Sequence, residues 1–207
     1  MNTNFPVLAS DRLILRQILD SDLENVYKGL SHPEVIKYYG VSFHSLEATK
    51  EQMTWFSDLK KNGTGIWWAV CLKDTGEFLG AGGLNDLDTK LKKAEIGFWL
   101  LPDHWGKGFM TEAMPLILDH SFNNMGLLRI EGFVETENKI CIKALQKLNF
   151  TYEETKENCE IKNGPPPSSS VSLGRLKFQS IKIKTPQNSL CIPSSFSLSL
   201  PNEKCCV

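Results

Sequence analysis

A glycine loop between a strand and a helix is the part of the sequence best suited to chemistry. The run 95–101 is rich in β-branched and aromatic residues and ends at Pro102, and helical spacing begins at Phe109. Between them lies the segment 105–108, which reads WGKG. A glycine loop that opens a helix directs several unpaired backbone N–H groups, and the positive end of the helix dipole, at one point. Phosphates bind at such points, and the loop therefore predicts a pyrophosphate ligand.

Two common nucleotide-binding motifs are poor matches to this loop. The sequence contains no G-x-x-x-x-G-K-S/T segment, and the residues after Gly108 lack the third glycine of a dinucleotide-binding fingerprint. A second glycine cluster, GAGG at 80–83, lies inside a strand-like run with no helix after it. Neither motif therefore identifies the phosphate ligand.

The stretch around the loop resembles the acetyl-coenzyme A loop of the GCN5-related N-acetyltransferases (the GNAT superfamily), whose pattern is Q/R-x-x-G-x-G/A. It is similar above all to the RimJ/RimL-like branch of ribosomal-protein N-terminal acetyltransferases, in which WGKG is followed by an aromatic or leucine and then by A/M-T-E-A. This chain reads WGKGFMTEA at 105–113, with Asp103 in place of Gln or Arg. The family pattern N-x-x-S/A, followed by L-G-F, reads NKIC at 138–141 and LNF at 148–150.

The resemblance implies that acetyl-CoA is bound at this loop as a co-substrate. The expected phosphate contacts are the backbone N–H groups of Trp105, Gly106, Lys107, Gly108, Phe109 and Met110. In the family arrangement the pantetheine arm pairs like an added strand with the backbone of Phe98, Trp99 and Leu100. Asn138 is expected either to hydrogen-bond the pantetheine or to cap a helix.

Direct transfer of an acetyl group from a thioester to an amine requires a neutral amine, a stabilised oxyanion and a protonated leaving thiolate. The resemblance assigns the base to Glu95, which accepts the amine proton directly or through a water; the alternative is an exposed strand carboxylate. Cys141 stands where related enzymes use a serine hydroxyl to protonate the thiolate, and a thiol with a pKa of about 8.5 suits that step better than a hydroxyl. The alternatives for Cys141 are a buried small residue and a covalent acetyl-cysteine intermediate.

The expected acceptor is a primary amine, either a protein N-terminus or a small-molecule amine. Tyr38 and Tyr39 are aromatic candidates for the wall of the acceptor site. Trp67 and Trp68 are further candidates, although core packing is the favoured interpretation of both. The alternative function is a catalytically inactive CoA-binding regulatory module, which the departures from the family pattern and the unusual C-terminal sequence motivate.

These residues need strands and helices to position them, and the hydrophobic spacing predicts both. Strands are predicted over 13–18, 66–72, 77–84, 93–101, 128–134 and 150–161, and helices over 21–32, 45–59, 109–124 and 138–148. The crossover through the helix 109–124 makes the strands 93–101 and 128–134 parallel. The resemblance implies the α+β GNAT fold, with a mixed, mostly antiparallel sheet of six to seven strands, four helices, and a parallel pair splayed around acetyl-CoA.

Residues 1–164 are predicted to form the GNAT N-acetyltransferase domain, because the resemblance ends at Gly164. The remaining segment, 165–207, is divergent and rich in proline and serine. Within it, 177–184 alternates in the manner of a strand. Two interpretations stay open, a last strand reached through a long loop or a mostly disordered tail.

Composition excludes several other classes of protein. With 207 residues, 41% of them hydrophobic, the chain suits one core, and a net charge of −1 without a Lys/Arg block argues against nucleic acid as a partner. No segment approaches the roughly 20 apolar residues of a membrane helix, and no secretory leader is visible, so the expected location is cytoplasmic, away from membranes. The six cysteines and four histidines lack metal-ligand spacing, and no metal is expected. Both a monomer and a homodimer are compatible with the sequence.

Overall fold

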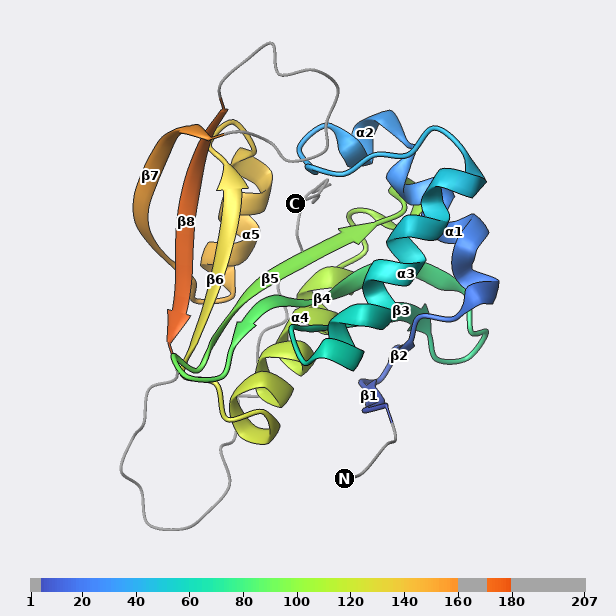
Figure 1. Ribbon diagram of the computed structural model, residues 1–207, viewed down its shortest axis with the longest axis horizontal. Helices are drawn as coiled ribbons and strands as arrows, with labels where there is room; N and C mark the ends of the chain where they lie inside the picture. The colour runs from blue at the N-terminus through green and yellow to red at the C-terminus, as the bar shows by residue number, and fades with distance from the viewer. Residues whose placement is uncertain (1–4, 160–170, 180–207) are drawn as a thin grey trace.

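The apolar strand runs of the sequence form one twisted sheet with helices on both faces (Figure 1). The computed structural model describes residues 5–159 and 171–179. Its elements are β1 (Leu8–Ala9), β2 (Leu13–Gln17), α1 (Leu23–Leu30), α2 (Pro33–Ile36), α3 (Leu46–Asn62), β3 (Ile66–Leu72), β4 (Phe78–Asp88), β5 (Lys93–Leu100), α4 (Phe109–Asp119), β6 (Arg129–Glu135), α5 (Lys139–Lys147), β7 (Thr151–Cys159) and β8 (Val171–Gln179). Single 3-10 turns at Asp20–Asp22 and Pro102–His104 precede α1 and the glycine loop, and a π-helical turn at His120–Asn124 follows α4.

The strands lie in the order β1-β2-β3-β4-β5-β6-β8-β7. Every neighbouring pair is antiparallel except β5 and β6, so the predicted mixed, mostly antiparallel α+β fold is confirmed. The predicted numbers of six to seven strands and four helices are too low, because the described residues form eight strands and five α-helices. The two-residue β1 and the four-residue α2 are too short to produce a periodic signal in the sequence.

The two faces of the sheet pack against different helices. On one face, strand residues such as Trp68 and Phe98 form a core with the inner side of α4 and with Cys141 and Leu145 of α5. On the other face, Trp67 and Trp99 pack with residues of α1 and α3 (Figure 1). Because successive residues of a strand point to opposite faces, neighbouring side chains of β5 enter different cores.

Strands β5 and β6 separate soon after they meet. Their parallel pairing comprises Lys93 with Arg129, Ala94 with Ile130, and Glu95 with Glu131. Beyond these pairs β5 continues to Leu100 and β6 to Glu135, and Figure 1 shows the two strands diverging. The splayed parallel pair that the resemblance implied is thus present in the structure.

The last strand begins earlier in the chain than the sequence suggested. Strand β8 comprises Val171–Gln179 and lies between β6 and β7, where it pairs with the whole of β6 from Glu135 to Arg129. The alternating segment 177–184 shares only its first three residues with this strand, and its remainder lies outside the described residues, as does the predicted turn at 162–164. Pairing with β6, rather than local alternation, decides where β8 begins.

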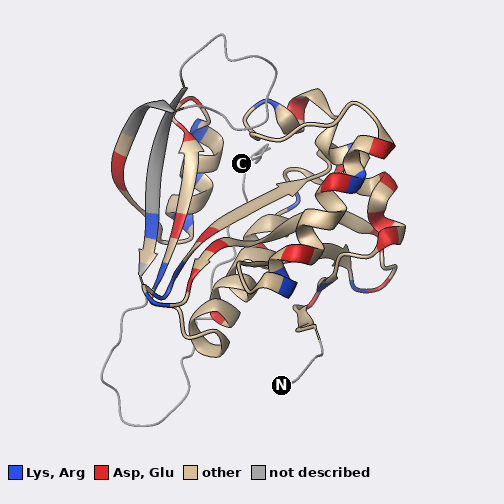
Figure 2. Ribbon diagram, in the orientation of Figure 1, with Lys and Arg blue, Asp and Glu red and all other residues tan. Residues whose placement is uncertain are grey.

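The described residues show neither a surface of one charge nor a membrane-spanning helix nor a group of metal ligands. Figure 2 shows Lys and Arg interspersed with Asp and Glu over the helices and strands. No helix in 5–159 or 171–179 is long and apolar enough to cross a bilayer. In the same residues, no group of three or more His, Cys, Asp or Glu is placed to hold a metal ion.

Candidate active site

The loop between β5 and α4 has the backbone conformation that its glycines permit. Gly106 and Gly108 have φ angles of 72° and 76°, in the left-handed region that favours glycine. Gly108 precedes the first turn of α4, and among the described residues no side chain caps this helix end. The indole N–H of Trp105 donates to the carbonyl of Leu100 at 2.9 Å and ties the loop to the end of β5. The first N–H groups of α4 are therefore left for a ligand.

Glu95 lies where β5 and β6 begin to diverge, since it is the last residue of the parallel pairing. Its pKa is raised to about 7, first because burial disfavours the carboxylate and second because Asp86 places a negative charge nearby. A hydrogen bond from Asn85 opposes these effects without cancelling them. A carboxyl group that ionises near neutral pH is suited to general-base catalysis.

An irregularity in β4 brings Asp86 next to Glu95. Asn85 pairs with Glu95 across the two strands, and the register then shifts between Asn85 and Asp88. Asp86 has a φ angle of 49°, which is unusual for a residue other than glycine. Bulges of this kind redirect side chains next to functional sites. The sequence analysis missed Asn85 and Asp86, because no glycine marks the irregularity.

Glu131, which pairs with Glu95 on β6, has a lowered pKa where Glu95 has a raised one. Glu131 accepts hydrogen bonds from Arg129 Nε at 2.7 Å and from Lys93 Nζ at 3.3 Å. Burial by itself raises the pKa of Glu131, but these bonds and the two positive charges outweigh it and lower the pKa. Of the two paired glutamates, Glu95 is therefore the one that exchanges a proton near neutral pH.

An indole lies across three strands beside Glu95. Trp67 on β3 is opposite Gly83 on β4, which in turn is opposite Gly97 on β5. A Cβ atom at Gly83 would lie 2.5 Å from the Cγ of Trp67, and one at Gly97 would lie 2.9 Å from its Cζ2. The glycines therefore leave room for the flat ring. Gly97 and Glu95 share a face of β5, but Trp67 is buried on that face and packs against Trp55 and Phe56 of α3, so it is a core residue beside the candidate base.

Cys141 lies on the other face of the sheet from Glu95. It is fully buried in the core beneath α4 and α5, together with Ile96 of β5. Its N–H donates to Asn138 Oδ1 at 3.1 Å, so Asn138 caps α5. A contact between Asn138 and a pantetheine arm stays a prediction. Glu95 and Cys141 therefore lie on opposite faces of the sheet.

The remaining predicted residues are distributed over β5 and the segment after α2. Residues 98–100 are buried in the part of β5 beyond the parallel pairing. Tyr39 packs against the core beneath α1 and α3, and Tyr38 contacts the ammonium group of Lys37. Trp68 faces the opposite core, where its indole N–H donates to the carbonyl of Pro6 at 2.8 Å. Trp68 is therefore a core residue.

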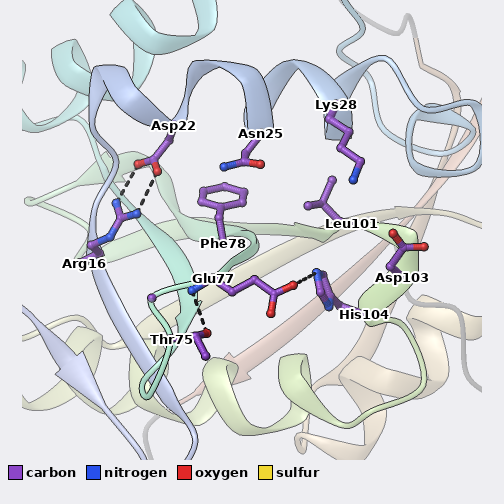
Figure 3. Close-up of a pocket in the computed structure, with 11 residues that line it drawn as sticks. Arg16, Asp22, Asn25, Lys28, Thr75, Glu77, Phe78, Leu101, Asp103 and His104 are labelled. Carbon is purple, nitrogen blue, oxygen red and sulfur yellow. Dashed lines mark hydrogen bonds and ion pairs between the residues drawn. The ribbon is translucent and has the colours of Figure 1, made fainter.

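A separate cavity of about 430 Å³ lies beside α1 (Figure 3). It is bounded by α1, the turn between β3 and β4, and the segment 101–104 that leads into the glycine loop. Within it, Arg16 forms an ion pair with Asp22, and His104 Nε2 lies 3.6 Å from Glu77 Oε1. None of the predicted catalytic residues lines this cavity.

Comparison with known proteins relates this arrangement to characterised folds. The profile of the acetyltransferase (GNAT) domain family matches residues 12–151. The uncharacterized N-acetyltransferase YoaA of Bacillus subtilis is 36% identical over 168 residues, which are 81% of this chain and 95% of that protein.

Two solved structures share the fold. The Salmonella typhimurium acetyltransferase described as modifying the N-terminal serine of ribosomal protein L7/L12 has a TM-score of 0.75 at 17% identity, over 85% of this chain and 100% of that one. The spermidine N-acetyltransferase of Vibrio cholerae, solved with CoA and spermine, has a TM-score of 0.70 at 19% identity, over 82% and 96% of the respective chains.

Proposed function

Because the chain belongs to the GNAT acetyltransferase family and is an N-acetyltransferase, we propose that it transfers an acetyl group from acetyl-CoA to a primary amine by direct attack in a ternary complex. The observation that carries this proposal is the position of Glu95. A carboxyl group with a pKa of about 7 lies at the point where two parallel strands open. The gap beyond it leads to a glycine loop suited to phosphates.

The backbone of β5 supports the placement of acetyl-CoA in this gap. Beyond Glu95, the edge of β5 that faces β6 has no strand partner among the described residues. An extended amide-containing chain binds such an edge as an added strand. The carbonyl of Leu100 already accepts the indole N–H of Trp105, so this carbonyl is not open to a ligand. The pantetheine arm then pairs with the other backbone groups on this edge of the predicted residues 98–100.

Two side chains supply the proton transfers. Glu95 accepts a proton from the acceptor ammonium, and the neutral amine then attacks the thioester carbonyl. Backbone N–H groups of the open β5 edge stabilise the negative charge that develops on the carbonyl oxygen. As the C–N bond forms and the C–S bond breaks, Cys141 donates its thiol proton to the leaving sulfur. Glu95, having released its first proton to solvent, accepts the proton that the attacking nitrogen loses, and Cys141 regains a proton from solvent when CoA leaves.

The opposite placement of Glu95 and Cys141 suits a single ligand between them. A thioester that lies between β5 and β6 is exposed to both faces of the sheet at once. The acceptor amine then approaches from the Glu95 face, while the sulfur lies toward α5, the helix that carries Cys141. Base and acid therefore act on opposite sides of the same carbonyl carbon.

The pKa of Glu95 favours an α-amino group as the acceptor. An α-ammonium has a pKa of about 8 and an alkyl ammonium of about 10.4, so proton transfer to Glu95 costs about 1 kcal/mol in the first case and more than 4 kcal/mol in the second. A peptide N-terminus or a small α-amine, as expected for the RimJ/RimL-like branch, is thus preferred over a polyamine. The physical reason for this preference is the lower free-energy cost of transferring the ammonium proton to Glu95.

An amine panel tests the proposal directly. Wild-type protein is incubated with acetyl-CoA and either short peptides with free N-termini or spermidine, and products are identified by mass spectrometry alongside the release of CoA thiol. We expect acetylated peptides and little acetylated spermidine. Acetylation of spermidine alone would contradict the α-amine assignment. CoA binding without any product across the panel would favour the inactive regulatory module.

A further inference from the structure

The glycine loop is held from outside by Arg12, which lies just before β2. The loop has few anchors of its own, since Gly106 and Lys107 are exposed and α4 lacks a side-chain cap. Both terminal nitrogens of Arg12 donate to the carbonyl of Lys107, each at 3.3 Å. The guanidinium also lies 4.8 Å from the ring centre of Phe109, the first residue of α4. One side chain therefore touches the loop and the start of the helix.

The same arginine is anchored on the helix through Glu112. Arg12 Nε donates to Glu112 Oε2 at 2.7 Å, and the backbone N–H of Arg12 donates to Oε1 at 3.1 Å. The hydroxyl of Ser10 donates to Oε1 at 2.6 Å and itself accepts the N–H of Leu13 at 3.1 Å. These bonds connect the first turn of α4 to the beginning of β2. The arginine thus has a fixed place beside the loop.

The bond to Lys107 determines where the next N–H group points. In a trans peptide the carbonyl of one residue and the N–H of the next point in opposite directions. With the Lys107 carbonyl directed at Arg12, the N–H of Gly108 is directed away from Arg12. That N–H is one of the donors assigned to the phosphates. A glycine-rich loop without this contact has more backbone conformations to lose when it binds.

The charge of Arg12 also suits an anion site. Glu112 lies in the first turn of α4, where its negative charge alone would repel a diphosphate. Burial opposes ionisation of Glu112, but hydrogen bonds from Ser10 and Arg12 outweigh it and lower the pKa of the carboxyl group. Glu112 is therefore ionised at neutral pH, and the adjacent guanidinium balances it at 2.6 Å.

We propose that Arg12 is a positioning residue for coenzyme A, which orients the Lys107–Gly108 peptide and neutralises Glu112 so that the glycine loop receives the diphosphate. This inference rests on the proposed function, because it assigns the loop to coenzyme A. Arg12 acts through the loop, and the amine site does not depend on it.

Titration calorimetry with CoA and steady-state kinetics on the full chain test this role. The variants are Arg12→Gln and Arg12→Lys, with Arg16→Gln as a matched control, because Arg16 forms a comparable paired contact with Asp22 at 2.7 and 2.9 Å. We expect Arg12→Gln to raise the Kd for CoA and the KM for acetyl-CoA about tenfold, because the loop loses the side-chain hydrogen bonds that Arg12 donates to the Lys107 carbonyl and to Glu112. The kcat at saturating acetyl-CoA and the KM for the amine should stay within twofold.

Comparison of Arg12→Lys with Arg12→Gln separates the effect of the peptide orientation from the effect of the positive charge. Arg12→Lys keeps the charge but cannot bridge the carbonyl and the carboxylate, so its KM for acetyl-CoA should fall between wild type and Arg12→Gln. Arg16→Gln should leave CoA binding unchanged even if it lowers thermal stability.

The outcomes distinguish this inference from the proposed function. If wild-type protein takes up no CoA, the proposed function fails. If wild type binds CoA and Arg12→Gln binds it equally well, or loses kcat and amine affinity to the same extent, the positioning role is wrong. Should Arg12→Gln not fold, Arg12→Lys carries the test, because a lysine cannot bridge the Lys107 carbonyl and Glu112, and an unchanged KM for acetyl-CoA in that variant would overturn the inference.

Discussion

Replacement of Glu95 by glutamine should make the protein less active and more stable. The pKa of Glu95 is about 7, against an ordinary value of 4.5. At about 1.4 kcal/mol for each pKa unit, this difference corresponds to about 3 kcal/mol of destabilisation when the buried carboxyl is ionised. Relaxation of Asp86 and Asn85 reduces the gain, and we expect Glu95→Gln to be about 2 kcal/mol more stable at pH 8.

The sign of the pH dependence follows from the raised pKa. The folded protein holds the Glu95 proton more tightly than the unfolded chain, so wild-type stability falls as the pH rises from about 4.5 to about 7. Glutamine does not titrate, and the advantage of the variant should vanish below pH 4.5. Thermal unfolding of wild type and Glu95→Gln at pH 4 and pH 8 measures this difference in stability. A gain of about 2 kcal/mol corresponds to a rise in Tm of about 4–8 °C at pH 8.

The activity of Glu95→Gln should fall although its stability rises. Without the base, kcat/KM should fall about a hundredfold or more, and the rise in rate through pH 7 that we expect of the wild type should be lost. Glu131→Gln is the matched control. The pKa of Glu131 is lowered by Arg129 and Lys93, so this variant should be less stable than wild type at pH 8. A Glu95→Gln protein with unchanged or lower Tm at pH 8 and full activity would refute the reasoning.

Three further substitutions test the site. Cys141→Ala should lower kcat about tenfold while the Kd for CoA stays within twofold, because the leaving sulfur loses its proton donor; unchanged turnover would leave Cys141 a packing residue. Gly97→Ala places a Cβ atom 2.9 Å from Cζ2 of Trp67, so urea unfolding should show a loss of about 1–3 kcal/mol, and Trp67→Phe in the same chain should recover part of it. Gly108→Ala at a φ of 76° should cost about 1–2 kcal/mol and raise the KM for acetyl-CoA but not for the amine; an equal change in both constants would contradict the loop assignment.

Features that depend on neighbouring residues were predictable from the sequence. The WGKG segment predicts a loop that opens a helix, and its two glycines do adopt positive φ angles. Asn149 stands in place of the family glycine after α5, and its φ angle of 65° supplies the left-handed turn that ends the helix. The alternation of side chains along β5 likewise places Glu95, Gly97 and Trp99 on one face.

Features that depend on distant residues required the tertiary structure. The contacts of Arg12 with Lys107 and Glu112 join residues about a hundred positions apart, and nothing in the local spacing indicates them. The raised pKa of Glu95 depends first on burial and second on Asp86, which an irregularity in β4 brings near it. Strand β8 is placed by its pairing with β6.

The sequence by itself predicted the longer strands and helices in their order and a glycine loop that opens a helix, and the resemblance to the family supplied the candidate base. The tertiary structure decided which faces those residues occupy, how Glu95 ionises and what holds the loop. The physical reason is that backbone preferences and alternation are set by adjacent residues, whereas burial and charge are sums over all the atoms that the fold brings together.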